Sequence, residues 1–383
     1  EYRGRQSCRN RFVGHGGNYG HSALASQSGT AGAARRLGKK RMIFASLSLA
    51  EAEGGVAAHS IRLPDHKIKK GQMISAQDIE KLAEHGMTHV MTARLEQDDV
   101  GEDQAAEQLA SCLTGAGIRR EGPATGRSNL FAACHGLLRV EPAQIDAVNM
   151  VSEAITVATL PNWRVVEEGE MVATVKIIPF AVPQKPLAEC CQLVAAQPPL
   201  HIAPFKPKRV GLIATTLPGL KSGVVRKTAE VLQKRLAVGG SDLVANRLVR
   251  HDEDSVRSAI CAMGPMVDLL IVFGASAMTD RRDVVPMALE QADGQIIHFG
   301  MPVDPGNLLL LGAWFDDDKR AVPVIGAPGC ARSPKENGFD WILQRLMADI
   351  AVTRDDIMRM GHGGLLMDVV HRGLPRAAIG VDP

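Results

Sequence analysis

The chain has 383 residues, of which 45% are apolar and 22% are charged. This is ample apolar material for packed cores and too long a chain for one small domain, so about two or three domains are expected. The 44 basic and 42 acidic residues are scattered along the chain and leave a net charge of +2. Because there is no basic block and only 4% of the residues are aromatic, we expect no nucleic-acid partner.

The seven cysteines form no CxxC pair, and the adjacent Cys190 and Cys191 have no partners at a zinc-binding spacing. Such cysteine usage is typical of a reducing cytosol. No apolar run reaches the ~18 residues needed to span a bilayer, and the first residues lack the hydrophobic core of a secretory signal. We therefore expect a soluble, cytoplasmic protein with no membrane partner.

Residues 1–41 are rich in Gly, Ser, Arg and Ala and show neither helical nor strand periodicity. We interpret them as a disordered or vector-derived segment, with Met42 as the natural beginning. Because the segment is rich in Arg and poor in acids, a transit peptide is the alternative.

Residues 42–120 have the pattern of a small α+β domain. The stretch "SLAEAEGGVAAHSIRL" predicts a helix that breaks at Gly54 and Gly55 and leads into a strand. A second helix is predicted after Ser75, because Ser75 and Asp78 have the spacing of a capping box.

Residues 121–200 have the pattern of a β-rich domain that ends in a linker. The stretch "RVVEEGEMVATVKIIPFAVP" predicts a hairpin with its turn at Glu168 and Gly169. The Pro-rich stretch "AAQPPLHIAPFKPKR" predicts a linker to the next domain.

Residues 208–350 alternate between apolar runs and helical patterns. The run "VDLLIVF", residues 267–273, is apolar at all positions but one, which is typical of a strand buried on both faces. The alternation predicts a doubly wound, Rossmann-like and mostly parallel sheet. The expected strands are 209–216, 241–249, 267–273, 295–299, 307–314 and 321–325, and the expected helices are 222–238, 252–263, 283–292 and 336–348. Residues 351–383 are expected to form a C-terminal helix and tail.

Four of these strands run into loops of small residues, namely "TTLPGLKSG", "GASAMTDRRD", "GMPVDPG" and "GAPGCARSPKENG". In a doubly wound sheet such loops meet at the carboxyl edge, where backbone N–H groups and helix N-termini receive anionic ligands. For any one loop, an ordinary turn is the alternative. The four together predict an anion-binding pocket.

The sequence matches neither a GxGxxG motif with an acid ~20 residues later nor a GxxxxGK[ST] motif. Instead, "FGASAMTDRRDVVPMAL", "MPVDPGNLLLLG" and "VIGAPGCARSPKENGFDWIL" resemble, in order and spacing, elements of the molybdopterin-binding domain family. These elements are Gly-Gly-x-Ser, Arg-Asp-x-x-Pro, Pro-Gly and Gly-x-Pro-Gly-Asn-Pro, found in the molybdotransferase and adenylyltransferase of molybdenum-cofactor biosynthesis and in gephyrin-like proteins. The stretch "VRHDEDSVRSAI" resembles the Val-Pro-Asp-Asp element of the same family.

Residues 42–200 resemble the region that precedes a molybdenum-cofactor nucleotidyltransferase domain in some bacterial proteins, through "IKKG", "DVGEDQAAEQLA" and "MVATVKIIPFAVP". The resemblance implies an α/β fold with a three-layer, mostly parallel sheet, preceded by smaller α+β and β-rich domains. The chain shows no Gly-rich nucleotide loop of such a transferase.

The resemblance also implies which residues bind the pterin. The loop after residue 273 would hold the phosphate, with Arg282 or Arg281 supplying charge unless they are a solvated loop pair. The loop with Pro305 and Gly306 would form the pocket wall, and the loop with Gly326, Pro328 and Gly329 would be the last one that faces the phosphate. The binding residues so implied are Gly274, Ala275, Ser276, Thr279, Arg282, Pro305, Gly306, Gly326, Pro328 and Gly329.

Two acids match catalytic positions of the family. Asp283 would act beside the phosphate or hold a magnesium ion, and its alternative role is the N-cap of the following helix. Asp252 matches the second acid, with a solvated charge at a helix start as the alternative. The loop "TTLPGLK" lacks the acids of the family's Thr-Gly-Asp-Glu, and Cys330 with Ala331 replaces its Asn-Pro. Cys330 is either a thiol near a metal or an inert buried thiol.

The missing acids favour binding over turnover, because magnesium near phosphates normally needs two or more oxygen ligands. The leading hypothesis is a molybdopterin-binding protein of molybdenum-cofactor biosynthesis or delivery. The alternatives are an active molybdenumtransferase or adenylyltransferase, and a regulatory scaffold with a degenerate pocket. The expected partners are molybdopterin, a molybdenum-cofactor nucleotidyltransferase or a molybdoenzyme, and further copies of the chain in a homo-oligomer.

Overall fold

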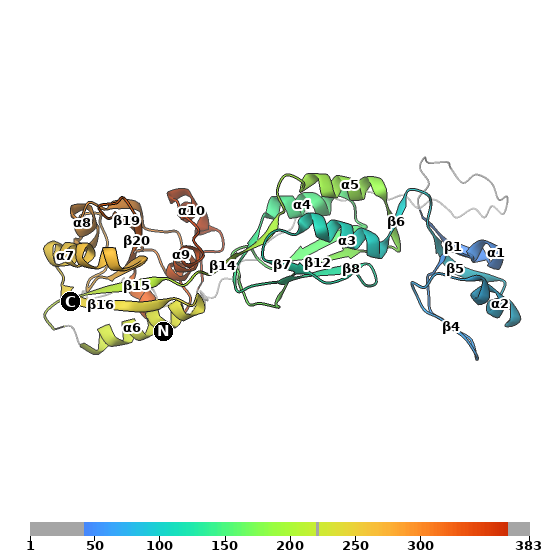
Figure 1. The fold of residues 1–383 in the computed structure, drawn as a ribbon, viewed down its shortest axis with the longest axis horizontal. Coiled ribbons are helices and arrows are strands. Elements are labelled where there is room, and N and C mark those ends of the chain that lie inside the picture. The colour runs from blue at the N-terminus through green and yellow to red at the C-terminus, as the bar shows by residue number, and fades with distance from the viewer. Residues whose placement is uncertain (1–41, 220–221, 367–383) are drawn as a thin grey trace, which may run out of the picture. The chain divides into compact units, whose positions relative to one another are not determined.

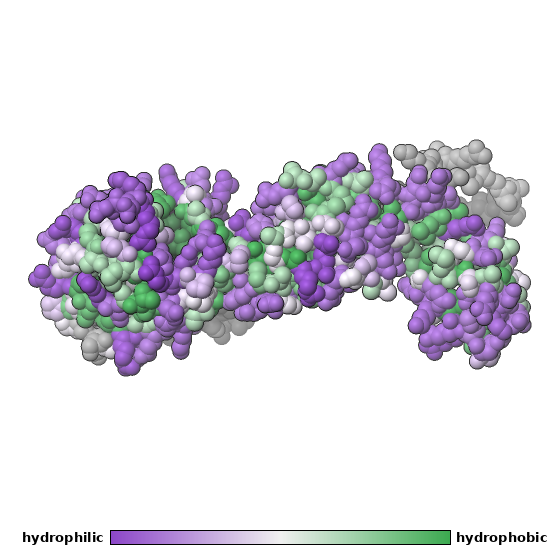
Figure 2. Space-filling model, viewed as in Figure 1, coloured by the Kyte–Doolittle hydropathy of each residue, from purple (hydrophilic) through white to green (hydrophobic). Residues whose placement is uncertain are grey.

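A computed structural model describes residues 42–219 and 222–366 (Figure 1). The predictions for residues 1–41 and for the C-terminal tail from residue 367 lie outside these ranges, as do positions 220 and 221 of the first small-residue loop. The described chain is a mixed α/β structure with several sheets. No helix in these ranges is long and apolar enough to cross a membrane, and the face drawn in Figure 2 is mostly covered by hydrophilic residues.

The first part of the described chain contains a three-stranded sheet with the order β1-β5-β2. The predicted second helix is confirmed as α2: Ser75 is its N-cap, and Ser75 and Asp78 form the capping box. Leu82 of α2 packs with Ile68 and Ile74 in a small core. The elements are β1 (Ile43–Ser48), α1 (Leu49–Ala52), β2 (Val56–Ala57), β3 (Ile61–Arg62), β4 (Lys67–Ile68), α2 (Ala76–Glu84) and β5 (His89–Arg94).

The middle of the chain contains sheets with the orders β10-β12-β8-β7, β11-β9-β14 and β13-β6. Its helices pack on a shared core that includes Leu109, Val148 and Leu187. The elements are β6 (Asp99–Gly101), α3 (Glu102–Leu113), β7 (Ile118–Arg120), β8 (Arg127–Ala132), β9 (Gly136–Val140), α4 (Pro142–Val151), β10 (Ile155–Thr159), β11 (Val165–Val166), β12 (Met171–Ile177), β13 (Ala181–Pro183), α5 (Gln184–Leu193) and β14 (Leu200–Pro204).

Two predictions for this part are wrong. The turn at Gly169 exists, with φ of 84°, but β11 pairs with β9 and β12 pairs with β8 and β10, so the two strands form no hairpin. The expected linker contains β14, which pairs along its whole length with β9 and buries Leu200 and Ile202. Strand pairing depends on distant segments, and local turn residues do not encode it.

Residues 208–350 contain the six-stranded sheet, with the order β16-β15-β17-β20-β19-β18. All ten predicted elements are present, with ends shifted by at most three residues. They are β15 (Arg209–Thr216), α6 (Ser222–Val238), β16 (Asp242–Arg250), α7 (Glu253–Met263), β17 (Leu269–Phe273), α8 (Val284–Gln291), β18 (Gln295–Phe299), β19 (Leu310–Phe315), β20 (Ala321–Ala327) and α9 (Gly338–Met347), with the short helices η1 (Gly264–Met266) and η2 (Gly329–Arg332). After residue 350, the described chain contains the short helices α10 (Arg354–Met358) and η3 (Arg359–Gly361).

The strand directions differ in part from the expectation of a parallel sheet. Strands β16, β15, β17 and β20 are parallel neighbours, whereas β19 is antiparallel to both β18 and β20. No helix lies between β18, β19 and β20. Parallel neighbours need a long crossover, usually a helix, and short connections favour antiparallel pairing.

The position of β17 in the sheet explains why residues 267–273 form an apolar run. Leu269, Ile271 and Phe273 pack with residues of α6 and α9, whereas Leu270 and Val272 pack with residues of α7 and α8. In Figure 1, α6 lies on one side of β15 and β16, and α7 and α8 lie on the other. Because both faces of β17 are covered, every position of the strand is buried.

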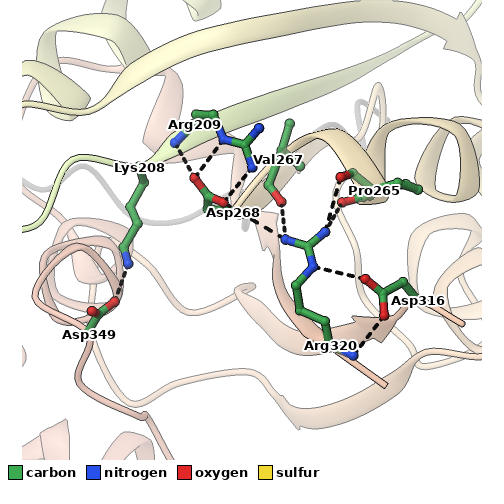
Figure 3. A network of polar contacts seen from close by, with 9 residues as sticks. Lys208, Arg209, Pro265, Val267, Asp268, Asp316, Arg320 and Asp349 are labelled. Carbon is green, nitrogen blue, oxygen red and sulfur yellow. Dashed lines mark hydrogen bonds and ion pairs between the residues drawn. The ribbon is translucent and has the colours of Figure 1, made fainter. Parts of the chain in front are cut away.

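The amino edge of the sheet is closed by paired charges (Figure 3). Asp268 accepts hydrogen bonds from the N–H of Arg209 at 2.9 Å and from its guanidinium at 3.0 and 3.2 Å. Arg320 donates to Asp316 at 3.0 Å and to the carbonyl oxygen of Val267 at 3.1 Å. The cations of this network are therefore neutralised by acids within the chain.

Candidate functional site

Four small-residue loops lie at the carboxyl edge of the six-stranded sheet. Strands β15, β17 and β20 run parallel, so their carboxyl ends point the same way. Strand β18 runs in this direction too, because two successive antiparallel pairings, β18 with β19 and β19 with β20, restore it. The loops after β15, β17, β18 and β20 therefore share one edge, as the sequence predicts.

The chain leaves β15 and β17 toward opposite faces of the sheet. Helix α6, which follows β15, packs in the core that contains Leu212, whereas α8, which follows β17, packs in the core that contains Ile213. Since β15 and β17 are neighbours, the point between their carboxyl ends is a topological switch point, where open α/β sheets bind ligands. Gly274, Ala275 and Ser276 follow β17 at this point.

The loop after β17 is attached to β15 through Thr215. The N–H of Ala275 donates a hydrogen bond to Oγ1 of Thr215 at 2.6 Å, and Thr215 is only 1% exposed. The amide of Ala275 is thus used within the protein. Ser276 is exposed, and its hydroxyl has no hydrogen-bond partner within the described ranges.

Gly274 lies in a narrow space at the end of β17. A Cβ on this residue would lie 2.8 Å from the carbonyl oxygen of Ser276, which is backbone and cannot move aside cheaply. It would also lie 3.7 Å from Cε1 of His251. Small size at position 274 is therefore required by the loop itself.

Arg332 is a cation at this edge that the sequence patterns did not single out. Its Nη2 donates to the carbonyl oxygen of Gly274 at 3.0 Å and its Nη1 to Oγ1 of Thr228 in α6 at 2.7 Å. Its guanidinium lies 4.9 Å from the ring centre of Phe273. Burial lowers the pKa of Arg332, and no acid within the described ranges pairs with it. The only sequence signal was its place three residues after Gly329.

The side chain of Asp283 is hydrogen-bonded to the backbone of its own loop. Its Oδ2 accepts hydrogen bonds from the N–H of Thr279 at 2.5 Å and of Asp280 at 3.0 Å, and these bonds lower the pKa of the carboxyl. The residue precedes α8 at the N-cap position but makes no side-chain cap hydrogen bond. Arg282 pairs with Asp280 at 2.7 Å, and its side chain is 87% exposed.

Asp252 caps helix α7. Its Oδ1 accepts from the N–H of Ser255 at 2.8 Å and its Oδ2 from the hydroxyl of Ser255 at 3.0 Å. Arg250 lies 3.2 Å from the same carboxylate. The bonds from Ser255 lower the pKa of Asp252. The acid is thus the N-cap of α7, whereas the alternative drawn from the sequence was a solvated charge at the helix start.

The remaining predicted binding residues lie in the loops after β18 and β20. Gly306 packs against the start of α9, because a Cβ there would lie 2.8 Å from the nitrogen of Gly338, and Pro305 accepts the N–H of Gly338 at 2.9 Å. Gly326 lies inside β20 and faces Met278 of the β17 loop. Pro328 precedes η2, and Gly329 begins it with open space beside its Cα.

The donor set of this edge does not fit a magnesium ion. Oδ2 of Asp283 is occupied by two backbone N–H groups, and Asp252 is occupied by Ser255 and Arg250. Within residues 42–219 and 222–366, no three His, Cys, Asp or Glu side chains come together as metal ligands. Burial raises the pKa of Cys330, so its thiol stays protonated near neutral pH and is a poor metal ligand.

Comparisons with known proteins give two kinds of similarity. Residues 46–94 match the model of a family described as a domain of unknown function, DUF8806. No curated protein matches the chain.

The solved structures that are similar to this chain include proteins of molybdenum-cofactor biosynthesis. The molybdopterin biosynthesis MoeA protein from Pyrococcus horikoshii is 17% identical, with 65% of this chain and 79% of that chain covered and a TM-score of 0.29. Molybdenum cofactor biosynthesis protein B is 16% identical, with 38% and 95% covered and a TM-score of 0.27.

Proposed function

We propose that this protein binds molybdopterin through its phosphate, at the carboxyl edge between β15 and β17, and acts in the biosynthesis or delivery of the molybdenum cofactor. The observation that carries the proposal is the switch point itself, where Gly274 to Ser276 meet the unneutralised cation of Arg332. A phosphate there would gain a charge-assisted hydrogen bond from a donor that already has low hydration. The sequence motifs that resemble molybdopterin-binding domains supply the identity of the pterin.

The roles within this proposal follow from the contacts. Ser276 supplies a hydroxyl that has no hydrogen-bond partner among the described residues. Gly329 has open space where a side chain would be, and Arg332 supplies positive charge. The N–H of Thr279 donates a hydrogen bond to the carboxylate of Asp283. Gly326 has no side chain, so Met278 can lie against β20. Gly306 and Pro305 fix the start of α9 and so shape the neighbouring loop.

An active molybdenumtransferase or adenylyltransferase is the second candidate. It would need Asp283 or Asp252 to face the ligand, and both carboxylates are instead engaged by groups of their own loops. Binding without turnover therefore agrees better with the geometry. If no pterin binds, a regulatory scaffold with a degenerate pocket is the candidate function that remains.

The proposal is tested with Arg332→Gln, which keeps a hydrogen-bond donor for Gly274 and removes the charge. We expect affinity for molybdopterin, measured by titration calorimetry on the full chain, to fall about 10-fold or more. The matched control is Arg257→Gln, an exposed arginine of α7 paired with Asp254, which should leave affinity unchanged.

Mass spectrometry of the purified protein gives a second readout, a co-purifying pterin. Wild-type protein that neither carries a pterin nor binds one in calorimetry would refute the proposal. Gly274→Val is a poor variant for this purpose, because its side chain would clash with the carbonyl oxygen of Ser276 and distort the loop whether or not a ligand binds.

A further inference from the structure

His251 lies at the switch point although no sequence motif assigns it a role. It directly follows β16, and its N–H donates to the carbonyl oxygen of Thr216 at 3.0 Å, which fixes its backbone beside β15. Its ring atom Cε1 lies 3.7 Å from the position that a Cβ would take on Gly274. His251 and Arg332 therefore both lie against Gly274.

A buried hydroxyl favours one of the two neutral tautomers of His251. Oγ1 of Thr215 accepts the N–H of Ala275 at 2.6 Å and lies 2.8 Å from Nδ1 of His251. The hydroxyl has one proton, and Nδ1 is the one acceptor for it among the described residues. Thr215 therefore donates to Nδ1, and the proton of the neutral ring lies on Nε2.

The Nε2–H group has no hydrogen-bond partner within the described ranges. His251 is half-buried, and Nε2 is bonded to the same Cε1 that faces Gly274. The edge thus offers a ring N–H donor from His251, held in orientation by Thr215, and a cation from Arg332. A phosphate with several acceptor oxygens can accept hydrogen bonds from both donors.

We propose that Nε2–H of His251 donates a hydrogen bond to a phosphate oxygen of the ligand bound at Gly274, and that Thr215 positions the ring for it. This inference rests on the proposed function, since it requires an anion at the switch point. It adds a binding residue, His251, and a positioning residue, Thr215, to the site.

The test compares two substitutions of His251 in the full chain, with inorganic phosphate and molybdopterin as probes. His251→Leu removes the donor, and we expect both probes to bind about 10-fold more weakly. His251→Gln places an amide N–H near the position of Nε2 and should keep affinity within about 3-fold of wild type. Thermal unfolding of each variant verifies that it is folded.

A second pair of variants tests the role of Thr215. Thr215→Ser keeps the hydroxyl and should bind phosphate like wild type. Thr215→Val removes both the contact with His251 and the acceptor for the N–H of Ala275, and it should weaken binding. In the wild-type protein, ¹⁵N NMR of the histidine rings should show His251 with its proton on Nε2. A proton on Nδ1 would overturn the inference without any variant.

The outcomes separate this inference from the proposed function. If wild-type protein binds phosphate and Arg332→Gln weakens the binding, equal affinity in folded His251→Leu overturns only the inference. If wild-type protein binds neither probe, both are overturned. Equal loss in the Leu and Gln variants would assign His251 a packing role and overturn its role as a donor.

Discussion

At the residue scale, the candidate site is characterised by which polar groups are already engaged. Asp283, Asp252 and Asp280 all have partners inside their own loops. Arg332 has only neutral partners, and Ser276 has none among the described residues. Groups that remain free after the protein has satisfied its own hydrogen bonds are those that a ligand can use.

Asp283→Asn tests whether this acid has a role beyond its loop. Asparagine keeps an acceptor oxygen for the N–H groups of Thr279 and Asp280, so we expect the free energy of unfolding to fall by no more than about 1 kcal/mol. We also expect pterin affinity to stay unchanged in the presence and in the absence of magnesium. A magnesium-dependent loss of affinity in the folded variant would instead restore Asp283 as a metal ligand or catalytic acid.

At the element scale, Arg235 connects α6 to the loop after β20 and to α9. Its guanidinium pairs with Asp340 at 2.5 Å and donates at 2.7 Å to the carbonyl oxygens of Ala331 and Ser333. The side chains of Arg235 and Asp340 are only 10% and 12% exposed. This pair therefore holds the loop that carries Arg332 against the body of the sheet.

Removing Arg235 should destabilise this part strongly. In Arg235→Met, the carboxylate of Asp340 loses its partner while nearly buried, so we expect a loss of about 3 kcal/mol in chemical denaturation. Arg226→Met is the control, since Arg226 lies on the same helix in an exposed pair with Glu230, and it should cost less than about 1 kcal/mol. Similar losses in both variants would contradict a special role for the Arg235 pair.

At the scale of the whole molecule, acids with lowered pKa values make folding depend on pH. Hydrogen bonds from Arg209 lower the pKa of Asp268, and hydrogen bonds from Lys206 and Lys208 lower that of Asp349. A carboxyl whose folded pKa lies below its usual value of 3.8 contributes stability that is fully present above that value. The contribution is lost as the pH falls through the lower, folded pKa.

We therefore expect the contribution of these acids to the melting temperature to be constant near neutral pH, and the melting temperature to fall as the pH is lowered below about 4. Asp268→Asn should melt lower than wild type at pH 7 and should lose less of its stability between pH 5 and pH 2, as measured by circular dichroism. Parallel curves for the two proteins would show that the Arg209 pair contributes nothing to acid unfolding. Asp317→Asn, at an exposed acid for which the structure shows no ion pair, is the control.

The sequence by itself determined the elements of residues 208–350 and the loops that follow the strands. Periodicity is a local property, and the apolar run at residues 267–273 is typical of a strand covered on both faces, as β17 is. The Ser75 cap was likewise readable, because a capping box lies within four residues. The small residues Gly274 to Ser276 could be placed at the carboxyl edge of the sheet, because they directly follow this strand.

Only the tertiary structure decided the pairing of strands and the partners of side chains. Strands β11 and β14 both pair with β9, and β19 runs antiparallel to β20. No local sequence pattern indicates which of these segments pair with one another. The contacts of Thr215 with His251 and of Arg332 with Gly274 bridge 36 and 58 positions of the sequence. A hydrogen bond depends on distance and angle in space. The hydrogen bonds of Asp283 and the neutral partners of Arg332 are therefore defined only when the loops are brought to one edge.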